Sequence, residues 1–439
     1  MLRVGVGQGA FAESSELMLS GLEAGVDYLV CDSLAETTSA FFALDRRRDE
    51  AAGFAPDLAG RVGVALPWVV NGTTRLITNA GGHNPLAAHQ AVVHAVRDAG
   101  HRGVGIGLVM AEPAQNAPGT YGPPSEGFAE QVYLGAAGIV RALDEGADIV
   151  VTGRVADAAL FLAPLVHEFG WGWDDWDRLA AGTVVGHVLE CSAQASGGNY
   201  SGDWWNTVDL ARIGLPIAEV AADGSAVLTK PAGSGGRVSF DTVREQFLYE
   251  VHDPAAYLTP DVVVDLTTVT LTDLGDDRVR VSGATGSARP KQLRGLTFSP
   301  GGWSSEALLT YCWPDASAKG RHVVAGLQKQ AADRGLAVSE WQVEQFGVEG
   351  FWPGLGEGDV CADPREVTTR LAWRTSDAVT ATAVQRLVGL VALSGPPGLQ
   401  GIGRRRLGPN PPAELVDIAP FFVDRDVVER DLQVLVVRT

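Results

Sequence analysis

The chain has 439 residues, 46% of them hydrophobic, and 34 basic against 53 acidic side chains give a formal net charge of −19. This length and composition allow a large buried core in more than one domain and exclude an intrinsically disordered protein. The acidity disfavours nucleic acid or an anionic membrane as the main partner, because long-range repulsion opposes both. The four cysteines lie far apart and form no CxxC pair, which is typical of a reducing cytoplasm. We expect neither a secretion signal nor a membrane span.

Strand-like and helix-like segments alternate over the first part of the chain. Buried strands are predicted at 4–6, 27–31, 75–78, 104–109 and 148–152. Helical patterns follow most of them, including an apolar helix at 158–169. This alternation predicts an α/β domain over residues 1–182, Rossmann-like or flavodoxin-like, with a doubly wound and mainly parallel sheet.

The pattern of predicted strands and helices changes after residue 182. A hairpin is expected with Gly275, Asp276 and Asp277 at its tip, and two further strands are expected on either side of a glycine turn at 301–302. These features predict an α+β domain over residues 183–345 that carries a glycine-rich loop. The Gly-, Pro- and acid-rich segment 353–363 is typical of a linker, so residues 346–439 are expected to form a small third module.

Polar groups and glycines follow the predicted parallel strands where each strand ends. Because strand connections in such sheets are right-handed, these turns lie along one edge and converge on one ligand. The side chains expected there are Glu36, Asn79, Asn84, Arg154 and Asp157, and the glycines that let backbone amides approach a ligand are Gly7, Gly9 and Gly81. We therefore predict the main pocket at this edge.

The first of these turns partly matches the glycine motif of dinucleotide-binding proteins. Gly5, Gly7 and Gly9 depart from GxGxxG because Ala10 holds the third glycine position. Asp32, at the end of the second strand, keeps a ribose-bearing ligand open as an alternative.

Further candidates lie in the later segments. Glu190 ends an apolar helical run, and Gln194, Gly197 and Gly198 come next, so polar groups reappear beside a glycine pair. In the segment 226–238, Lys230 and the amide of Gly235 suit a phosphate or carboxylate, with a flexible surface loop as the alternative. His252, beside an aspartate, is a candidate acid or base, or else a packed or capping residue.

The motifs of several enzyme classes are missing from the chain. HExxH, GxSxG and GxxxxGK[ST] do not occur, which excludes zinc proteases, α/β-hydrolases and P-loop nucleotide triphosphatases. We predict no metal site. The remaining carboxylates, amides and arginine suit an anionic or carbonyl-bearing small molecule.

Five segments together resemble the acyclic terpene utilisation (AtuA-type) family. They are GRVADAALFLAPLVHEFGWGWDDWDRLAAGTVVGHVLECSAQASGG from residue 153, SLAETT at 33–38, ITNAGGHNP at 77–85, ADGSAVLTKPAGSGGRV at 222–238 and EQFLYEVHDPAAYLTPDVVVD at 245–265. The tail from about Glu366 resembles the ferredoxin-like module that follows in that family. The resemblance implies breakdown of branched, terpenoid acyl chains handled as coenzyme A thioesters, without fixing a reaction or a cofactor.

Two classes of function fit these features. The first is a hydratase or lyase acting on an acyl thioester, with Glu36, Asp157, Glu190 and His252 transferring protons and Arg154 and Lys230 holding the anionic part. The second is a non-catalytic subunit that binds an acyl or nucleotide-like ligand within a larger assembly. Because aromatic clusters are enriched in interfaces, the group Trp171, Trp173, Trp176, Trp204 and Trp205 predicts a homo-oligomer, with internal packing as the alternative.

Overall fold

The computed structural model describes residues 1–111, 119–122, 127–209, 211–348, 364–403 and 411–439. The chain forms two compact units, one of Met1–Phe298 with Ile418–Thr439 and one of Ser299–Asp417. The expected linker at 353–363 lies outside the described residues. The predicted domain boundaries at residues 182 and 345 stay predictions.

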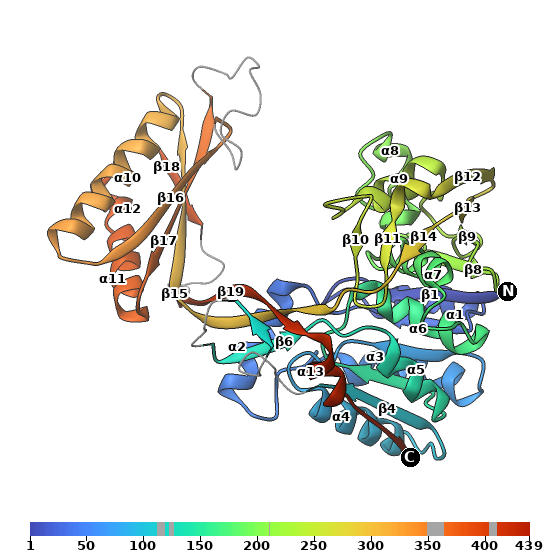
Figure 1. Ribbon diagram of the computed structural model, residues 1–439. Coiled ribbons are helices and arrows are strands. Elements are labelled where there is room, and N and C mark those ends of the chain that lie inside the picture. Colours follow the sequence, from blue (N-terminus) through green and yellow to red (C-terminus); the bar gives the residue numbers. More distant parts are fainter. Residues whose placement is uncertain (112–118, 123–126, 210, 349–363, 404–410) are drawn as a thin grey trace. The chain divides into compact units, whose positions relative to one another are not determined.

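The first unit is built on a ten-stranded mixed sheet (Figure 1). Its strands lie in the order β12 (Thr270–Gly275), β13 (Arg278–Ser282), β9 (Ala226–Thr229), β8 (Ile217–Val220), β1 (Leu2–Gln8), β2 (Tyr28–Cys31), β3 (Arg75–Thr78), β7 (Ile149–Thr152), β4 (Gly105–Met110) and β20 (Gln433–Arg438). The five strands from β1 to β4 in this order run parallel, and the strands on both sides of them pair antiparallel. A mixed α/β fold is confirmed, and the hairpin expected in a separate α+β domain forms β12 and β13, which extend this same sheet.

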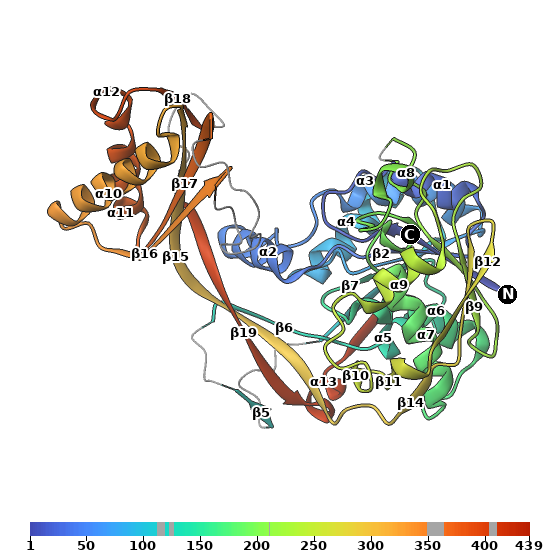
Figure 2. The ribbon, with the colours of Figure 1, turned by 90° about the horizontal axis from the view of Figure 1, so that it is seen from above.

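Helices cover both faces of the parallel strands. On β2, Tyr28 and Val30 pack into one apolar core, whereas Leu29 and Cys31 pack into the other. The core of Leu29 and Cys31 is completed by α1 (Leu17–Glu23), α3 (Leu58–Val70) and α4 (Pro85–Asp98), and the core of Tyr28 and Val30 by α5 (Ala137–Asp144), α6 (Asp157–Phe169) and α7 (Trp176–Leu189). The labels α3 and α5 to α7 accordingly lie on opposite sides of β2 in Figure 2.

The neighbouring strands β3 and β7 send the chain to opposite faces of the sheet. β3 is followed by α4 in one core, and β7 is followed by α6 in the other. In an open α/β sheet, such a switch point leaves a crevice at the carboxyl ends of the strands. Asn79 and Arg154 follow these two strands, so both lie at the switch point.

Helices α6 and α7 approach each other closely because two glycines of α7 face α6. A Cβ atom on Gly182 would lie 2.6 Å from the Leu162 side chain, and one on Gly186 would lie 2.6 Å from the Ala158 carbonyl oxygen. Because α7 packs so tightly against the first turn of α6, its end at Glu190 is carried toward the sheet edge where Asp157 begins α6.

Shorter elements of the first unit surround this frame. They are α2 (Glu36–Arg48), β5 (Thr120–Tyr121), β6 (Ala129–Val132), η1 (Gln194–Ser196), α8 (Trp204–Thr207), α9 (Phe240–Leu248), β10 (Tyr257–Leu258), β11 (Val263–Asp265), η2 (Leu266–Thr268), β14 (Thr285–Ser287) and α13 (Arg425–Arg430). Ser239 caps α9, and it forms a capping box with Thr242.

The second unit contains part of β15 (Gln292–Cys312), α10 (Ala316–Asp333), β16 (Val338–Phe346), β17 (Glu366–Thr375), α11 (Ala378–Val388), α12 (Val391–Ser394), β18 (Leu399–Gly403) and part of β19 (Ala413–Asp424). β15 pairs antiparallel with β17 and β18, and β17 pairs antiparallel with β16. The helices pack on one apolar core with Leu309, Leu371 and Trp373. The glycine turn expected at 301–302 is wrong, because β15 continues through it with Gly302 at φ +86°.

Among the described residues, no helix is long and apolar enough to cross a membrane.

Candidate functional site

A cavity of about 540 Å³ lies beside the carboxyl ends of the parallel strands. We call it the acid cavity, since Asp157, Glu190 and Glu250 are among its lining residues. The rest of its wall is largely apolar, and it is formed by Tyr133, Ala156, Ala158, Tyr257, Leu258, Thr259, Pro260, Pro290, Gln292, Leu293, Arg294 and Phe422. Two predicted catalytic carboxyls therefore face one cavity.

Asp157 forms a carboxyl pair with Asp32. The two side chains share a hydrogen bond, and Asp32 also accepts from the Leu34 amide at 3.0 Å and from Asn79 Nδ2 at 2.6 Å. Burial and the Asp32 charge hold the pKa of Asp157 well above its usual value, while Arg154 opposes them. Burial also raises the pKa of Asp32. Because two carboxylates need a hydrogen atom between them to bond, the pair retains one proton.

Glu190 is paired with His187, a residue that is fully buried in α7. His187 Nδ1 lies 3.0 Å from Glu190 Oε1, and Nε2 lies 3.2 Å from the Phe247 carbonyl oxygen. A carbonyl only accepts, so Nε2 carries a hydrogen and one further proton is shared between Nδ1 and Glu190. Burial raises the pKa of Glu190, and the His187 hydrogen bond opposes that rise. A carboxylate at a helix C-terminus is also disfavoured by the helix dipole.

Arg154 is the central cation of the site. Its buried guanidinium donates to the Leu34 carbonyl at 2.8 Å and contacts Asp157 Oδ1 at 3.3 Å. Its Cζ atom lies 4.7 Å from the centre of the Tyr133 ring, and the Tyr133 hydroxyl donates to Glu36 Oε1 at 2.7 Å. Burial opposes ionisation of Glu36, but Tyr133 and the charge of Arg154 lower its pKa overall. Glu36 is thereby held as a carboxylate behind Tyr133.

Asn79 and Gly81 support this arrangement from the end of β3. Asn79 is fully buried, and its Oδ1 accepts from the Ser33 amide at 2.7 Å while its Nδ2 holds Asp32. The Ser33 hydroxyl donates to Gln8 Oε1 at 2.9 Å. The Gly81 amide donates to the Thr152 carbonyl at 3.0 Å, so it ties β3 to β7 and is not available to a ligand.

The glycines after β1 serve packing. The Gly9 amide already donates to Glu13 Oε2 at 2.9 Å, and a Cβ atom on Gly9 would lie 2.1 Å from the Ser192 nitrogen and 2.5 Å from the Glu190 oxygen. A Cβ atom on Gly7 would lie 2.7 Å from Cys31 Sγ. These two glycines were expected to contact a ligand, but in the structure they allow close packing within the protein. Gly9 packs directly against the backbone of Glu190.

Four other predicted ligand residues are engaged within the protein. Asn84 caps α4, accepting from Ala87 and donating to the Glu50 and Ala52 carbonyls. Gln194 donates to Gln246 at 2.5 Å and accepts from Asn199 at 3.0 Å. The amides of Gly197 and Gly198 donate to the carbonyls of Gln194 and Ala193. None of Gln194, Gly197 and Gly198 lines the acid cavity.

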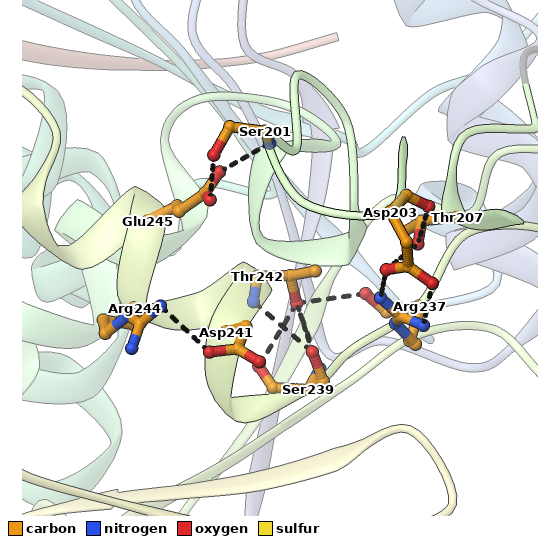
Figure 3. Close-up of polar contacts among 9 residues, drawn as sticks. All are labelled: Ser201, Asp203, Thr207, Arg237, Ser239, Asp241, Thr242, Arg244 and Glu245. Carbon is orange, nitrogen blue, oxygen red and sulfur yellow. Dashed lines mark hydrogen bonds and ion pairs between the residues drawn. The ribbon is translucent and has the colours of Figure 1, made fainter. Parts of the chain in front are cut away.

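The glycine-rich loop at 230–236 is closed on itself. Lys230 Nζ lies 2.8 Å from the Ser234 carbonyl oxygen and 3.0 Å from Asp277 Oδ2, and the Gly235 amide donates to the Arg212 carbonyl at 2.6 Å. Arg237 pairs with Asp203, and Figure 3 shows these two side chains facing each other. The cations and this amide have partners inside the chain, so the geometry gives the predicted anion site no support.

His252 does not reach the acid cavity. It follows α9 and is exposed, whereas the cavity takes Glu250 from the same turn. An exposed imidazole in a turn has no surroundings that would orient it toward a substrate. The buried histidine of the site is His187.

Asp32, Tyr133, His187 and Arg294 also belong to the candidate site, although none of them is predicted from the sequence to be catalytic. From the sequence, Asp32 is expected only to contact a ribose. His187 precedes Glu190 by three residues, a spacing that places both on one helix face and that carried a usable signal. Tyr133 and Arg294 are brought together by the pairing of β6 with β15, which joins segments far apart in the chain.

The tryptophan cluster divides into buried and exposed members. Trp171 is only 4% exposed and packs in the first unit's core, so it cannot serve an interface. Trp173 and Trp176 pack partly against the same core. Trp204 and Trp205 are 56% and 65% exposed. Among the described residues, no group of three or more His, Cys, Asp or Glu is placed to hold a metal ion.

Fold and site together define a mixed α/β protein with a buried cluster of carboxyl groups at the carboxyl edge of its sheet. Residues 2–434 match the acyclic terpene utilisation family protein AtuA. The chain therefore belongs to the AtuA family, and this membership implies a part in acyclic terpene utilisation. No curated protein and no solved structure matches the chain.

Proposed function

We propose that the chain is an enzyme of the hydratase or lyase type that acts on a branched, unsaturated acyl thioester, such as a coenzyme A thioester. The observation that carries the proposal is the pair of carboxyls, Asp157 and Glu190, that face one cavity. Each belongs to a pair that shares one proton, Asp157 with Asp32 and Glu190 with His187. One cavity thus offers both a proton donor and a proton acceptor at the same pH, which acid–base catalysis requires.

The proposed reaction is addition of water across a carbon–carbon double bond conjugated to the thioester carbonyl. One carboxylate takes a proton from water while the water oxygen bonds to Cβ. The other carboxyl, which is protonated, then gives its proton to Cα, so no redox partner is needed. We assign the two roles to Asp157 and Glu190 without an order, because each pair holds one proton.

The wall of the acid cavity supports an acyl substrate. Leu258, Leu293 and Phe422 are apolar and suit a branched hydrocarbon chain. Arg294 lines the same cavity, and its guanidinium lies 5.4 Å from the centre of the Tyr133 ring. A cation there suits the carbonyl oxygen, on which negative charge develops during the reaction.

Turnover tests the proposal directly. The purified protein is incubated with a panel of branched, unsaturated coenzyme A thioesters, and water addition is followed by loss of the conjugated-thioester absorbance and by the mass of one added water. The proposal expects turnover that is lost in Asp157→Asn. Binding of the thioesters without turnover would instead support the alternative, a ligand-binding subunit of a larger assembly.

Three finer structural expectations are kept as proposals. For the first unit we propose the doubly wound class, supported by helices on both sheet faces. For the second unit we propose a ferredoxin-like fold, supported by the antiparallel order β16, β17, β15, β18. We also propose a cytoplasmic homo-oligomer, supported by the free thiols of Cys31, Cys191 and Cys312 and by exposed Trp204 and Trp205. If the parent protein and a Trp205→Ser variant both sediment as strict monomers, the homo-oligomer is excluded.

A further inference from the structure

A second cavity, of about 370 Å³, lies at the switch point between β3 and β7. Arg154 stands between the two cavities, because it lines this one while it contacts Asp157 and Tyr133 of the acid cavity. The remaining wall is formed by Arg46, Gly82, His83, Asn84, Pro85, Leu86, Met110, Ala111, Glu130, Gln131, Val132, Leu134 and Gly153. The position is one at which open α/β sheets bind ligands.

Three side chains of this second cavity carry buried polar atoms with no hydrogen-bond partner among the described residues. They are His83 Nε2, both side-chain amide atoms of Gln131, and Arg154 Nε. His83, Gln131 and Arg154 are 5%, 7% and 4% exposed. Leaving such atoms unpaired is costly, and buried polar atoms in folded proteins nearly always have partners. Four orphaned atoms around one cavity therefore point to a polar occupant.

The donor and acceptor character of these atoms defines the occupant. His83 donates from its other ring nitrogen to the Ser39 backbone, which leaves Nε2 as an acceptor. Burial and the charges of Arg46 and Arg154 lower the pKa of His83 to about 3, so the ring stays neutral. Arg154 Nε is a donor, and the Gln131 amide offers one acceptor and one donor group.

We propose that this second cavity binds a small molecule that carries a hydrogen-bond donor beside an acceptor oxygen, as in a carboxamide or an α-hydroxy acid. The donor serves His83 Nε2 or Gln131 Oε1, and the acceptor oxygen serves Arg154 Nε or the Gln131 nitrogen. A plain carboxylate supplies only acceptors and leaves His83 Nε2 and Gln131 Oε1 unpaired. This site does not depend on the reaction proposed for the acid cavity.

Ligand-observed nuclear magnetic resonance with three probes of similar size tests the site on the full chain. Propionamide carries the neutral donor–acceptor pair, lactate carries it on an anion, and propionate lacks the donor. We expect propionamide or lactate to bind and propionate not to bind. Tighter binding of propionamide would identify the natural ligand as a carboxamide, and tighter binding of lactate would identify it as a hydroxy acid. If propionate binds as tightly as lactate and propionamide do, or if no probe binds, the proposal is overturned and water remains as the occupant.

Gln131→Leu and Gln131→Met assign the binding to this cavity. Each keeps the side-chain volume but removes both amide atoms, so binding should weaken roughly tenfold or more. Neither should lower the melting temperature, because each deletes unpaired polar atoms. The matched control is Gln246→Leu, since Gln246 is also buried but donates to the His187 carbonyl at 2.9 Å and accepts from Gln194. Its loss should therefore destabilise the fold. Unchanged probe binding in both Gln131 variants contradicts the assignment.

Discussion

His187 Nδ1 and Glu190 Oε1 lie 3.0 Å apart in a buried contact at the end of α7. The two residues are three positions apart, and the Phe247 carbonyl fixes the hydrogen on the far ring nitrogen. The proton of this pair is therefore shared only between Nδ1 and the Glu190 carboxyl. Glu190 also lines the acid cavity. In the reaction that we propose, His187 is therefore a positioning residue that sets how readily Glu190 exchanges a proton there.

Glu190→Gln should abolish turnover while the fold stays stable. The glutamine amide can still donate to His187 Nδ1, but it cannot transfer a proton. Removal of an acid–base group typically costs about 10²–10⁴-fold in rate. Turnover and thermal melting of the variant are compared with those of Glu168→Gln, a change at a carboxylate outside the acid cavity. Full activity of Glu190→Gln would exclude the acid–base role, and a much lower melting temperature would make Glu190 structural.

Gly9→Ala should destabilise the fold and displace Glu190. The added Cβ would lie 2.1 Å from the Ser192 nitrogen and 2.5 Å from the Glu190 oxygen, and both are backbone atoms with little freedom to move. Overpacking of this kind costs about 1–3 kcal/mol. In Gly60→Ala, within α3, nothing lies within 4 Å of the new Cβ, so that control should gain up to about 1 kcal/mol from helix propensity. Urea unfolding of both variants measures the contrast, and equal stabilities would refute it.

Asp261 should make stability depend on pH. Burial raises its pKa from 3.8 to about 6, while hydrogen bonds from the Ala136 amide oppose the rise. Between these two values the folded state holds the proton more tightly than the unfolded state. The contribution of Asp261 to the free energy of unfolding is therefore fully present below the pKa of the unfolded state. It is lost as pH rises through about 6, and the loss amounts to about 3 kcal/mol.

Asp261→Asn removes this titration and should flatten the pH profile. The free energy of unfolding in urea is measured at about pH 4 and about pH 8, on either side of the transition. Asp276→Asn is the matched control, because Asp276 is exposed at a hairpin tip with φ +50°, a conformation that asparagine accepts. A profile of Asp261→Asn as steep as that of the parent would show that this carboxyl is not the cause.

The two arginines near Tyr133 should separate stability from substrate binding. Arg154→Met leaves the Asp157 pair without its cation. Breaking a fully buried ion pair costs about 3–5 kcal/mol, and because the Asp157 side chain is 36% exposed we expect a smaller loss, of more than about 1 kcal/mol. Arg294 is exposed, and its guanidinium lies over the Tyr133 ring, so Arg294→Met should change stability by less than about 1 kcal/mol. If Arg294 holds the thioester carbonyl, its loss raises KM or lowers kcat. Unchanged kinetics for Arg294→Met would remove that role.

The local elements, and the sheet edge on which polar groups gather, follow from signals within the amino-acid sequence. The β3 bounds at 75–78 agree with expectation, because strand periodicity is a local signal, and α4 begins at Pro85, a residue that suits the first helical turn. Asn79, Arg154 and Asp157 follow their strands at one edge because right-handed connections leave no other arrangement.

Contacts between distant parts of the chain determine which of these groups face a cavity and which protons they share. The partner of Asp157 is 125 positions earlier in the chain, at Asp32, and Tyr133 meets Glu36 across a span of 97 residues. Lys230 and Gly9 looked free in the sequence, yet Asp277 and Glu13 engage them in the fold. Charge pairing and burial depend on long-range packing, and these two quantities shift the pKa values of Asp32, Glu36, Asp157 and Glu190.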